Sequence, residues 1–173
     1  MRYRVGYTVN PYRKEIMNKR IPRIYVDSSV VGGKFNTRIA EQTKPFWDAV
    51  ERGEFVIIAS DVLDDELAGA PKRAQDFFYG LPQTSIERVI STEESDDLAE
   101  KYIAEGVVGE SSLADCKHIA LATLTGADAL ISWNFRHMIY RRAGYNDVNE
   151  KLGYPIITIQ TPEKLMEVSH DET

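Results

Sequence analysis

The chain has 173 residues, of which 43% are hydrophobic and 28% are charged, a composition typical of one globular domain. It contains a single cysteine, Cys116, which excludes an intramolecular disulfide and favours a reducing compartment, the cytoplasm. No apolar run approaches the roughly 20 residues that cross a bilayer, so the sequence predicts no membrane span.

The net charge of −6 is unevenly distributed along the chain. Residues 1–23 hold seven basic side chains against one acid, a net charge of +6 that leaves −12 on the other 150 residues. We expect residues 1–20 to be a basic N-terminal extension and residues 21–173 to form the domain. The extension either tethers nucleic acid or an acidic partner, or is a leader with no role in the fold.

From Arg23 onward, short apolar runs alternate with helical patterns. Runs rich in β-branched residues predict buried strands at 23–27, 55–60, 129–132 and 155–160, and a weaker strand at 85–91. Amphipathic spacing predicts helices near 41–52, 61–70, 72–79, 93–105 and 112–125. The alternation indicates one α/β domain around a mostly parallel sheet.

Four polar residues fall at the carboxyl edge of such a sheet. Asp27 ends the first strand, Asn134 follows the fourth, and Glu66 lies on the helix after the second. Asp115 occupies the first turn of the helix that leads into the fourth strand, so it lies at the same edge. Ligands of open α/β sheets bind there, and clustered carboxylates at this edge predict a site for a divalent cation such as Mg²⁺.

Each acid also has a purely structural interpretation. Asp27 can start a turn with the serines and glycines that follow it, and Glu66 can belong to a buried ion pair. Asp115 lies three residues after Ser112, a spacing that resembles a capping box. His118, one turn further on, either orients Asp115 or contacts phosphate, or is an ordinary packed helix histidine.

Four stretches of the chain occur in a fixed order: IYVDSSVVGG, DVLDDEL, SLADCKHIALATLTGADALISWNFRHM and PIITIQTPEKL. In this order and spacing they resemble the PIN-domain family, which includes the VapC-type toxin ribonucleases. The resemblance spans residues 23–167. It implies a five-stranded sheet of order 3-2-1-4-5 flanked by helices, and Mg²⁺- or Mn²⁺-dependent cleavage of single-stranded or structured RNA. It also implies that three acids bind the metal, namely Asp27, Glu66 and Asp115. Three further residues would support them, namely Ser28, Ser132 and His118.

Asn134 occupies the position where many members of that family carry a fourth aspartate. Its side-chain amide is neutral, so the site carries one negative charge less than it would with an aspartate. We therefore expect a one-metal resting site and weaker binding of a second metal. The resemblance implies an endoribonuclease that is the toxin of a toxin–antitoxin pair and forms a homodimer. The alternative is a catalytically weakened PIN-like protein that binds RNA, serves as a scaffold or takes part in RNA processing.

Basic side chains follow the proposed site in the stretch NFRHMIYRR, and they are Arg136, His137, Arg141 and Arg142. Because the domain is acidic, RNA must be held by local basic patches, and this cluster is either such a patch or a solvated face. Lys34 and Arg38 form a second candidate set. Trp133 and Phe135 flank Asn134 and either stack on a base or pack in the core.

Overall fold

The computed structural model describes residues 20–170 of the chain. The expected basic extension lies outside the described residues except for Arg20, whose guanidinium pairs with the buried carboxylate of Asp128. Within the described part of the chain, no helix is long and apolar enough to cross a membrane.

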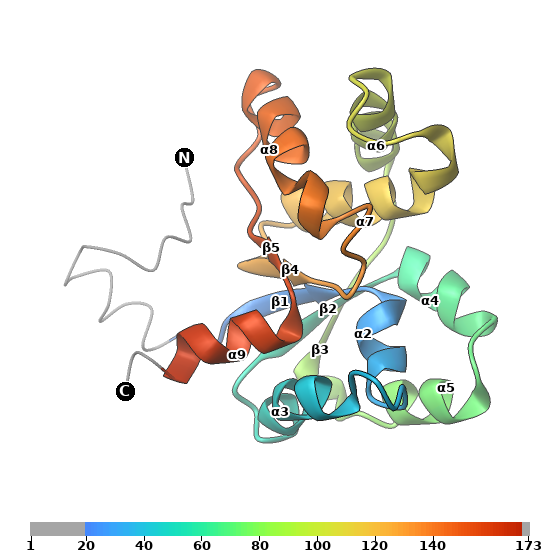
Figure 1. The fold of residues 1–173 in the computed structure, drawn as a ribbon, viewed down its shortest axis with the longest axis vertical. Coiled ribbons are helices and arrows are strands. Elements are labelled where there is room, and N and C mark those ends of the chain that lie inside the picture. The colour runs from blue at the N-terminus through green and yellow to red at the C-terminus, as the bar shows by residue number, and fades with distance from the viewer. Residues whose placement is uncertain (1–19, 171–173) are drawn as a thin grey trace.

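The sheet has five strands in the order β3-β2-β1-β4-β5, and every neighbouring pair is parallel (Figure 1). Strand β1 lies at the centre, with Ile24 opposite Ile57 on one side and Ala129 on the other. This confirms the predicted order. The strands are β1 Arg23–Val26, β2 Val56–Ser60, β3 Ile86–Val89, β4 Ala129–Ile131 and β5 Ile159–Gln160.

The fifth strand is shorter than the predicted 155–160, and its first residues explain why. Pro155 has no backbone N–H to donate to a sheet. The backbone N–H of Ile157 donates instead to the side-chain oxygen of Asn146, at 2.9 Å. The carbonyl of Thr158 is the first group of this segment to accept a bond from β4, from Leu130 at 2.8 Å.

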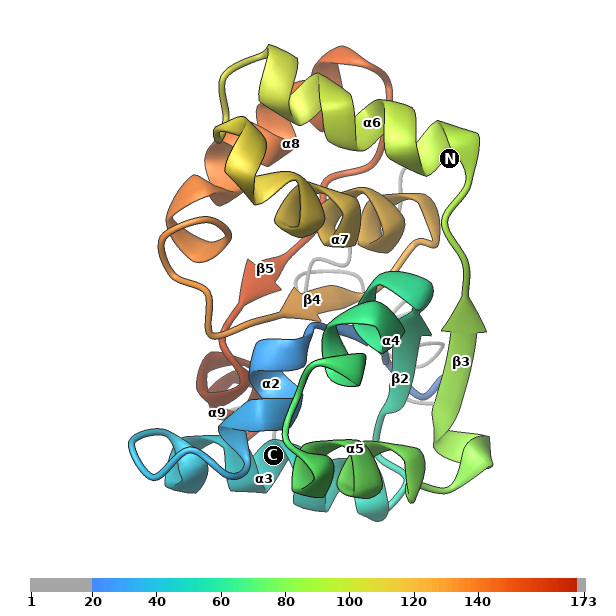
Figure 2. The same ribbon diagram turned by 90° about the vertical axis from the view of Figure 1, so that its right-hand side faces the viewer.

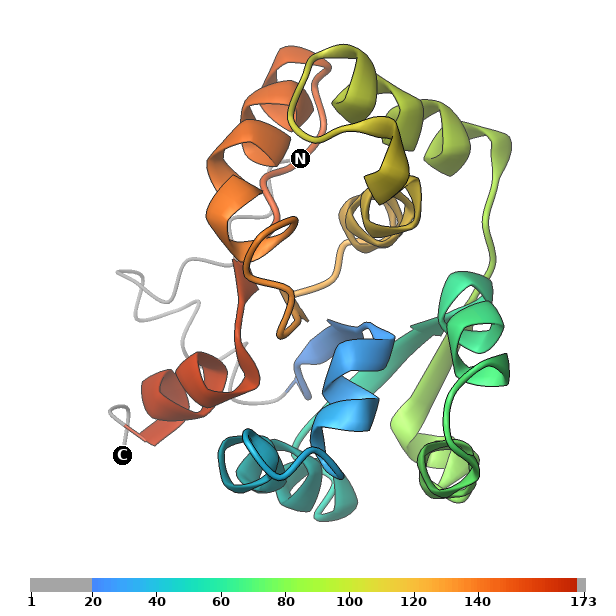
Figure 3. The same ribbon diagram turned by 45° about the vertical axis from the view of Figure 1, so that its right-hand side comes forward.

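Five helices match the predicted ranges to within two residues at each end: α3 Ala40–Glu51, α4 Asp61–Ala68, α5 Lys72–Tyr79, α6 Glu93–Ala104 and α7 Leu113–Leu124. Three more have no counterpart among the predicted elements: α2 Ser28–Gly33, α8 Arg142–Lys151 and α9 Pro162–His170. Helices α6, α7 and α8 lie together on one side of the sheet, and α3, α5 and α9 lie on the other (Figures 2 and 3).

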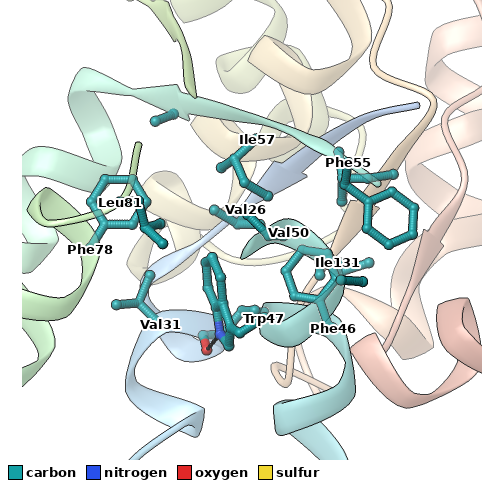
Figure 4. Packing of buried hydrophobic residues seen from close by; sticks show 14 of the residues in the cluster. Val26, Val31, Phe46, Trp47, Val50, Phe55, Ile57, Phe78, Leu81 and Ile131 are labelled. Carbon is teal, nitrogen blue, oxygen red and sulfur yellow. Dashed lines mark hydrogen bonds between the residues drawn. The ribbon is translucent and has the colours of Figure 1, made fainter. Parts of the chain in front are cut away.

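A hydrophobic core therefore forms on each face of the sheet. Along β1, Ile24 and Val26 belong to the core under α3, whereas Tyr25 belongs to the core under α7. This alternation is the two-residue period of a strand buried on both faces. In the first core, Trp47 of α3 packs close to Val26 and Ile57 (Figure 4).

Candidate functional site

Asp27 both ends β1 and caps helix α2. Its Oδ1 accepts hydrogen bonds from Ser29 N at 3.1 Å, Ser29 Oγ at 2.6 Å and Val30 N at 3.3 Å, and its Oδ2 accepts one from Ser132 Oγ at 2.6 Å. The residue is only 4% exposed. Burial raises the pKa of the Asp27 carboxyl, and the charge of His118 and the serine hydrogen bonds offset only part of that effect.

Glu66 lies at the same edge of the sheet because α4 begins directly after the carboxyl end of β2. Ser60 caps this helix through a 3.1 Å bond from Leu63 N to its Oγ, and serine is among the residues that favour this position. Leu63 packs into the core under α3 while Val62 packs into the core under α7. With α4 held between the two cores, the Glu66 side chain is left at the rim, 30% exposed.

The Glu66 carboxylate forms an ion pair with His118, with 2.5 Å between Oε1 and Nε2. The structural alternative for Glu66 is therefore present, with its partner on α7, 52 residues further along the chain. Burial alone raises the pKa of Glu66, but the hydrogen bond and charge of His118 outweigh it, and hydrogen bonds from Ser28 add to the effect. The net result is a lowered pKa, so Glu66 is held as a carboxylate.

His118 is completely buried, and its second ring nitrogen is also bonded. Nδ1 lies 2.7 Å from the hydroxyl of Tyr25, which lies 2.7 Å from Ser60 Oγ. Burial lowers the pKa of His118, but the hydrogen bond and charge of Glu66 outweigh it and the pKa is raised. Of the three interpretations of His118 left open by the sequence, orientation of Asp115 through a hydrogen bond does not occur, since both ring nitrogens have other partners.

Asp115 lies in the first turn of α7, half-buried. The side chain of Ser112 makes no capping hydrogen bond, so the capping-box interpretation is not borne out. Burial raises the pKa of Asp115, the charge of His118 counteracts it, and the charges of Asp27 and Glu66 raise it further. The three acids are therefore close enough to interact electrostatically, although 88 residues separate the first from the last.

Asn134 is linked to Asp27 through Ser132. The Oγ of Ser132 donates to Asp27 and accepts the backbone N–H of Asn134 at 2.9 Å. The side-chain oxygen of Asn134 accepts the backbone N–H of His137 at 3.0 Å, which folds the following residues into a turn. Asn134 thus lies at the edge where the sequence places it, with its amide oxygen engaged by the turn.

The chemistry of these residues fits a hard divalent cation, but their arrangement is incomplete. Among residues 20–170, no group of three or more His, Cys, Asp and Glu side chains is arranged to hold a metal ion. Mg²⁺ takes oxygen ligands and is commonly bound through only one or two carboxylates, with waters completing its shell. Asp115 accepts no hydrogen bond from the described residues, and Oδ2 of Asp27 accepts only one, so these oxygens are available for such binding.

The basic stretch that follows Asn134 is exposed. Arg136, Arg141 and Arg142 lie on the surface, and no carboxylate among the described residues lies within ion-pair distance of any of them. His137 is half-buried, close enough to Asp115 for its charge to act on that carboxyl. These cations therefore remain available to an anionic partner.

The aromatic residues of this stretch divide between core and surface. The ring nitrogen of Trp133 donates to Thr43 Oγ1 at 3.0 Å, and its ring packs against the core under α3, so core packing describes this residue. Phe135 is 40% exposed and contacts Tyr140, with 5.6 Å between ring centroids. Tyr140 is 74% exposed, and it is not among the candidate residues predicted from the sequence.

Lys34 and Arg38, the second candidate set for RNA binding, make no hydrogen bond or ion pair with the three acids in the part of the chain that the structure describes. The Lys34 ammonium lies 3.7 Å from the ring centroid of Phe77 on α5. Arg38 is exposed, and its backbone N–H donates to the side chain of Asn36 at 3.0 Å.

Searches with protein-family models and among curated proteins gave no match to this chain. Among solved structures, the chain is similar to VapC20 of Mycobacterium tuberculosis, a toxin that cleaves the sarcin–ricin loop. The TM-score is 0.51, the match covers 66% of this chain and 92% of that one, and the sequence identity is 16%. The fold is PIN-like. At this identity the similarity concerns the fold alone.

Proposed function

We propose that the protein is a divalent-metal-dependent endoribonuclease that cuts single-stranded segments of RNA at the site formed by Asp27, Glu66 and Asp115. The observation that carries this proposal is the convergence of three carboxyls from three different elements at the carboxyl edge of the sheet, where they act on one another's pKa. Negative charges that lie this close together destabilise the folded state unless a bound cation neutralises their repulsion. The PIN-like fold supports the same assignment.

Each acid has a distinct part in this proposal. A bound Mg²⁺ or Mn²⁺ supplies charge neutralisation at the scissile phosphate and a water of lowered pKa. Asp27, fixed by four hydrogen bonds, is the rigid ligand, and Asp115, which has no internal donor among the described residues, is the adaptable one. Glu66 is kept ionised by His118, and Ser28 and Ser132 support the two carboxylates that they contact.

RNA is held, in this proposal, by the exposed stretch that follows Asn134. Arg136 and Arg141 contact phosphates, with Arg142 and His137 beside them. The absence of ion-pair partners for the arginines within the described residues favours this role, because no internal salt bridge has to break when phosphate binds.

Replacing Arg136 and Arg141 together by Gln is expected to weaken RNA binding and to make it less sensitive to salt. Two lost phosphate contacts on a single strand reduce the slope of log K against log salt by about 1.4. The matched control replaces Lys72 and Lys164 by Gln, removing the same charge from side chains that already pair with Asp76 and Glu167. Binding titrations on an uncleavable RNA measure both slopes, and equal slopes for the two variants would remove the arginines from the RNA site.

Phe135 and Tyr140 are expected to stack on unpaired bases next to the cut. Replacing Tyr140 by Ala disturbs little packing because the ring is mostly exposed. The affinity for single-stranded RNA is expected to fall by about 1–3 kcal/mol per lost base contact, while the affinity for duplex RNA of the same length stays unchanged. An equal loss for both RNAs would contradict a stacking role.

The toxin of a toxin–antitoxin pair is the biological role that we propose, with an antitoxin protein as partner, a homodimer as the working form and the cytoplasm as the location. The similarity to a VapC toxin supports it, as does the free, buried Cys116, which suits a reducing compartment. Growth arrest on expression of the wild type but not of an Asp27 variant tests the role, and light scattering tests the dimer.

A second candidate function is an RNA-binding protein that has lost most of its nuclease activity. One observation favours it: the described acids are not arranged as a three-ligand metal site. The resemblance to PIN-domain proteins adds a second argument, because Asn134 corresponds there to a position that is an aspartate in many members. A panel of structured RNAs, including a sarcin–ricin loop oligonucleotide, incubated with Mg²⁺, Mn²⁺ or EDTA separates the two. The nuclease proposal requires cleavage that needs metal and is lost in Asp27→Asn, whereas binding without cleavage supports the second candidate.

A further inference from the structure

A chain of hydrogen bonds starts at the N-cap of helix α4 and ends on that helix. Ser60, which caps α4, is bonded to the hydroxyl of Tyr25 in the central strand, and Tyr25 is bonded to Nδ1 of His118 on α7. The other nitrogen of His118 pairs with Glu66 of α4, six residues after Ser60. The end of β2, the central strand β1 and the helices α4 and α7 are thereby joined next to one of the three acids.

We propose that His118 is a positioning residue that, backed by Tyr25 and Ser60, holds the Glu66 carboxylate in the place where it serves the divalent cation. The inference rests on the proposed function and adds to it a role for buried residues that do not touch the metal. None of the roles that the sequence leaves open for His118 involves Glu66, Tyr25 or Ser60.

The need for such a device follows from the side chain of Glu66 itself. A glutamate has three rotatable side-chain bonds, and this one is partly exposed, so without an anchor it populates many orientations. His118 has no freedom to follow it, since the ring is fully buried, makes an edge contact with Tyr25 and is bonded at both nitrogens. One rigid donor therefore restricts the carboxylate, and partners that orient metal ligands in this way typically contribute about 10- to 100-fold to metal affinity.

The competing account is that His118 neutralises Glu66 and so weakens metal binding. The two accounts make opposite predictions for variants that lack the donor. If His118 positions Glu66, its loss weakens metal binding even though a cationic group has been removed. If it acts as a competing cation, its loss strengthens metal binding.

The test measures Mn²⁺ binding without RNA, from the disappearance of the electron paramagnetic resonance signal of free Mn²⁺. His118→Leu keeps the bulk and removes the donor, and its dissociation constant for Mn²⁺ is expected to rise about 10-fold or more. His118→Gln places an amide N–H near the position of Nε2 and is expected to stay within about threefold of the wild type. Tyr25→Phe removes only the hydroxyl behind His118 and is expected to lie between these two.

Tyr102→Phe is the matched control for the tyrosine variant. Tyr102 is equally buried in the core under α7, and its hydroxyl donates to Asn149 at 2.6 Å, away from the acids. It loses a buried hydrogen bond as Tyr25→Phe does, but its Mn²⁺ affinity is expected to match that of the wild type. Thermal unfolding of all variants in EDTA verifies that each one is folded.

The outcomes separate the inference from the function on which it rests. Equal or tighter Mn²⁺ binding in His118→Leu and Tyr25→Phe, with normal binding in the wild type, overturns the positioning role and leaves the nuclease proposal standing. A wild type that binds no Mn²⁺ overturns both. If His118→Leu does not fold, Tyr25→Phe decides the question in the same way.

Discussion

The Asp27→Asn variant is expected to lose RNA cleavage by at least about 100-fold while keeping the fold. The substitution replaces the most rigid of the three carboxylates by a neutral amide, which binds a divalent cation less tightly. The cation that would assist attack on the phosphate is therefore held more weakly. The fold survives because the Asn oxygen still accepts from the backbone N–H groups of Ser29 and Val30 and its amide group donates to Ser132. Single-turnover cleavage of a labelled RNA, with circular dichroism as the control, measures both effects.

The stability of the same variant carries a second expectation, about pH. The pKa of Asp27 is raised in the folded state, so its contribution to stability is complete below its ordinary pKa and is lost as the pH rises through the folded value. Asn has no such loss. In EDTA, the stability of the variant relative to the wild type is therefore expected to increase as the pH rises from the ordinary pKa of an aspartate through the raised pKa of folded Asp27.

A variant that cleaves RNA at the wild-type rate would remove Asp27 from the mechanism, whatever its stability.

The Asn134→Asp variant is expected to respond more strongly to metal than the wild type. An aspartate oxygen still accepts the backbone N–H of His137, so the turn after β4 is retained. The backbone of this residue is joined to Asp27 through the hydroxyl of Ser132, so the new charge is introduced near the acids and is expected to add to their repulsion. Without metal, the variant is expected to be about 1 kcal/mol less stable than the wild type.

Adding Mn²⁺ is expected to reverse this order. If the fourth carboxylate tightens binding about tenfold, saturating Mn²⁺ stabilises the variant by about 1.4 kcal/mol more than the wild type. Thermal unfolding at increasing Mn²⁺ concentration measures the difference, and RNA cleavage at low metal is expected to rise with it. Identical Mn²⁺ responses would show that Asn134 lies outside the cation site and that its role is limited to the turn.

The strands and most helices were accessible from the sequence because their patterns are local. Helix α2 was not, since DSSVVGG reads equally well as a turn. Only the structure shows Asp27 capping a helix whose end, at Gly33, lies so close to Trp133 and Thr43 that a Cβ atom would make a contact of 3.0 Å with each. Helix α9 had a visible signal in Thr161 and Pro162, a cap followed by a proline at the first helical position, and Thr161 Oγ1 does accept from Lys164 N at 3.1 Å.

The site was predictable in position but not in connectivity. A parallel sheet brings strand ends to one edge, so the convergence of Asp27, Glu66 and Asp115 follows from topology. Which donor each carboxylate finds depends on how the helices pack, and no periodicity in the sequence encodes the contact between Glu66 and His118. The same holds for α8, whose polar sequence hides the two residues, Tyr145 and Val148, that anchor it in the core under α7.

The most direct test of the cation site is an anomalous difference map from crystals soaked in Mn²⁺. The account predicts a peak between the carboxylates of Asp27 and Asp115, with Glu66 binding directly or through water, and no such peak in crystals of Asp27→Asn. The contradicting result is a wild-type map without density at these acids, whether Mn²⁺ is bound elsewhere in the crystal or not at all. This edge of the sheet would then not be the metal centre of a nuclease.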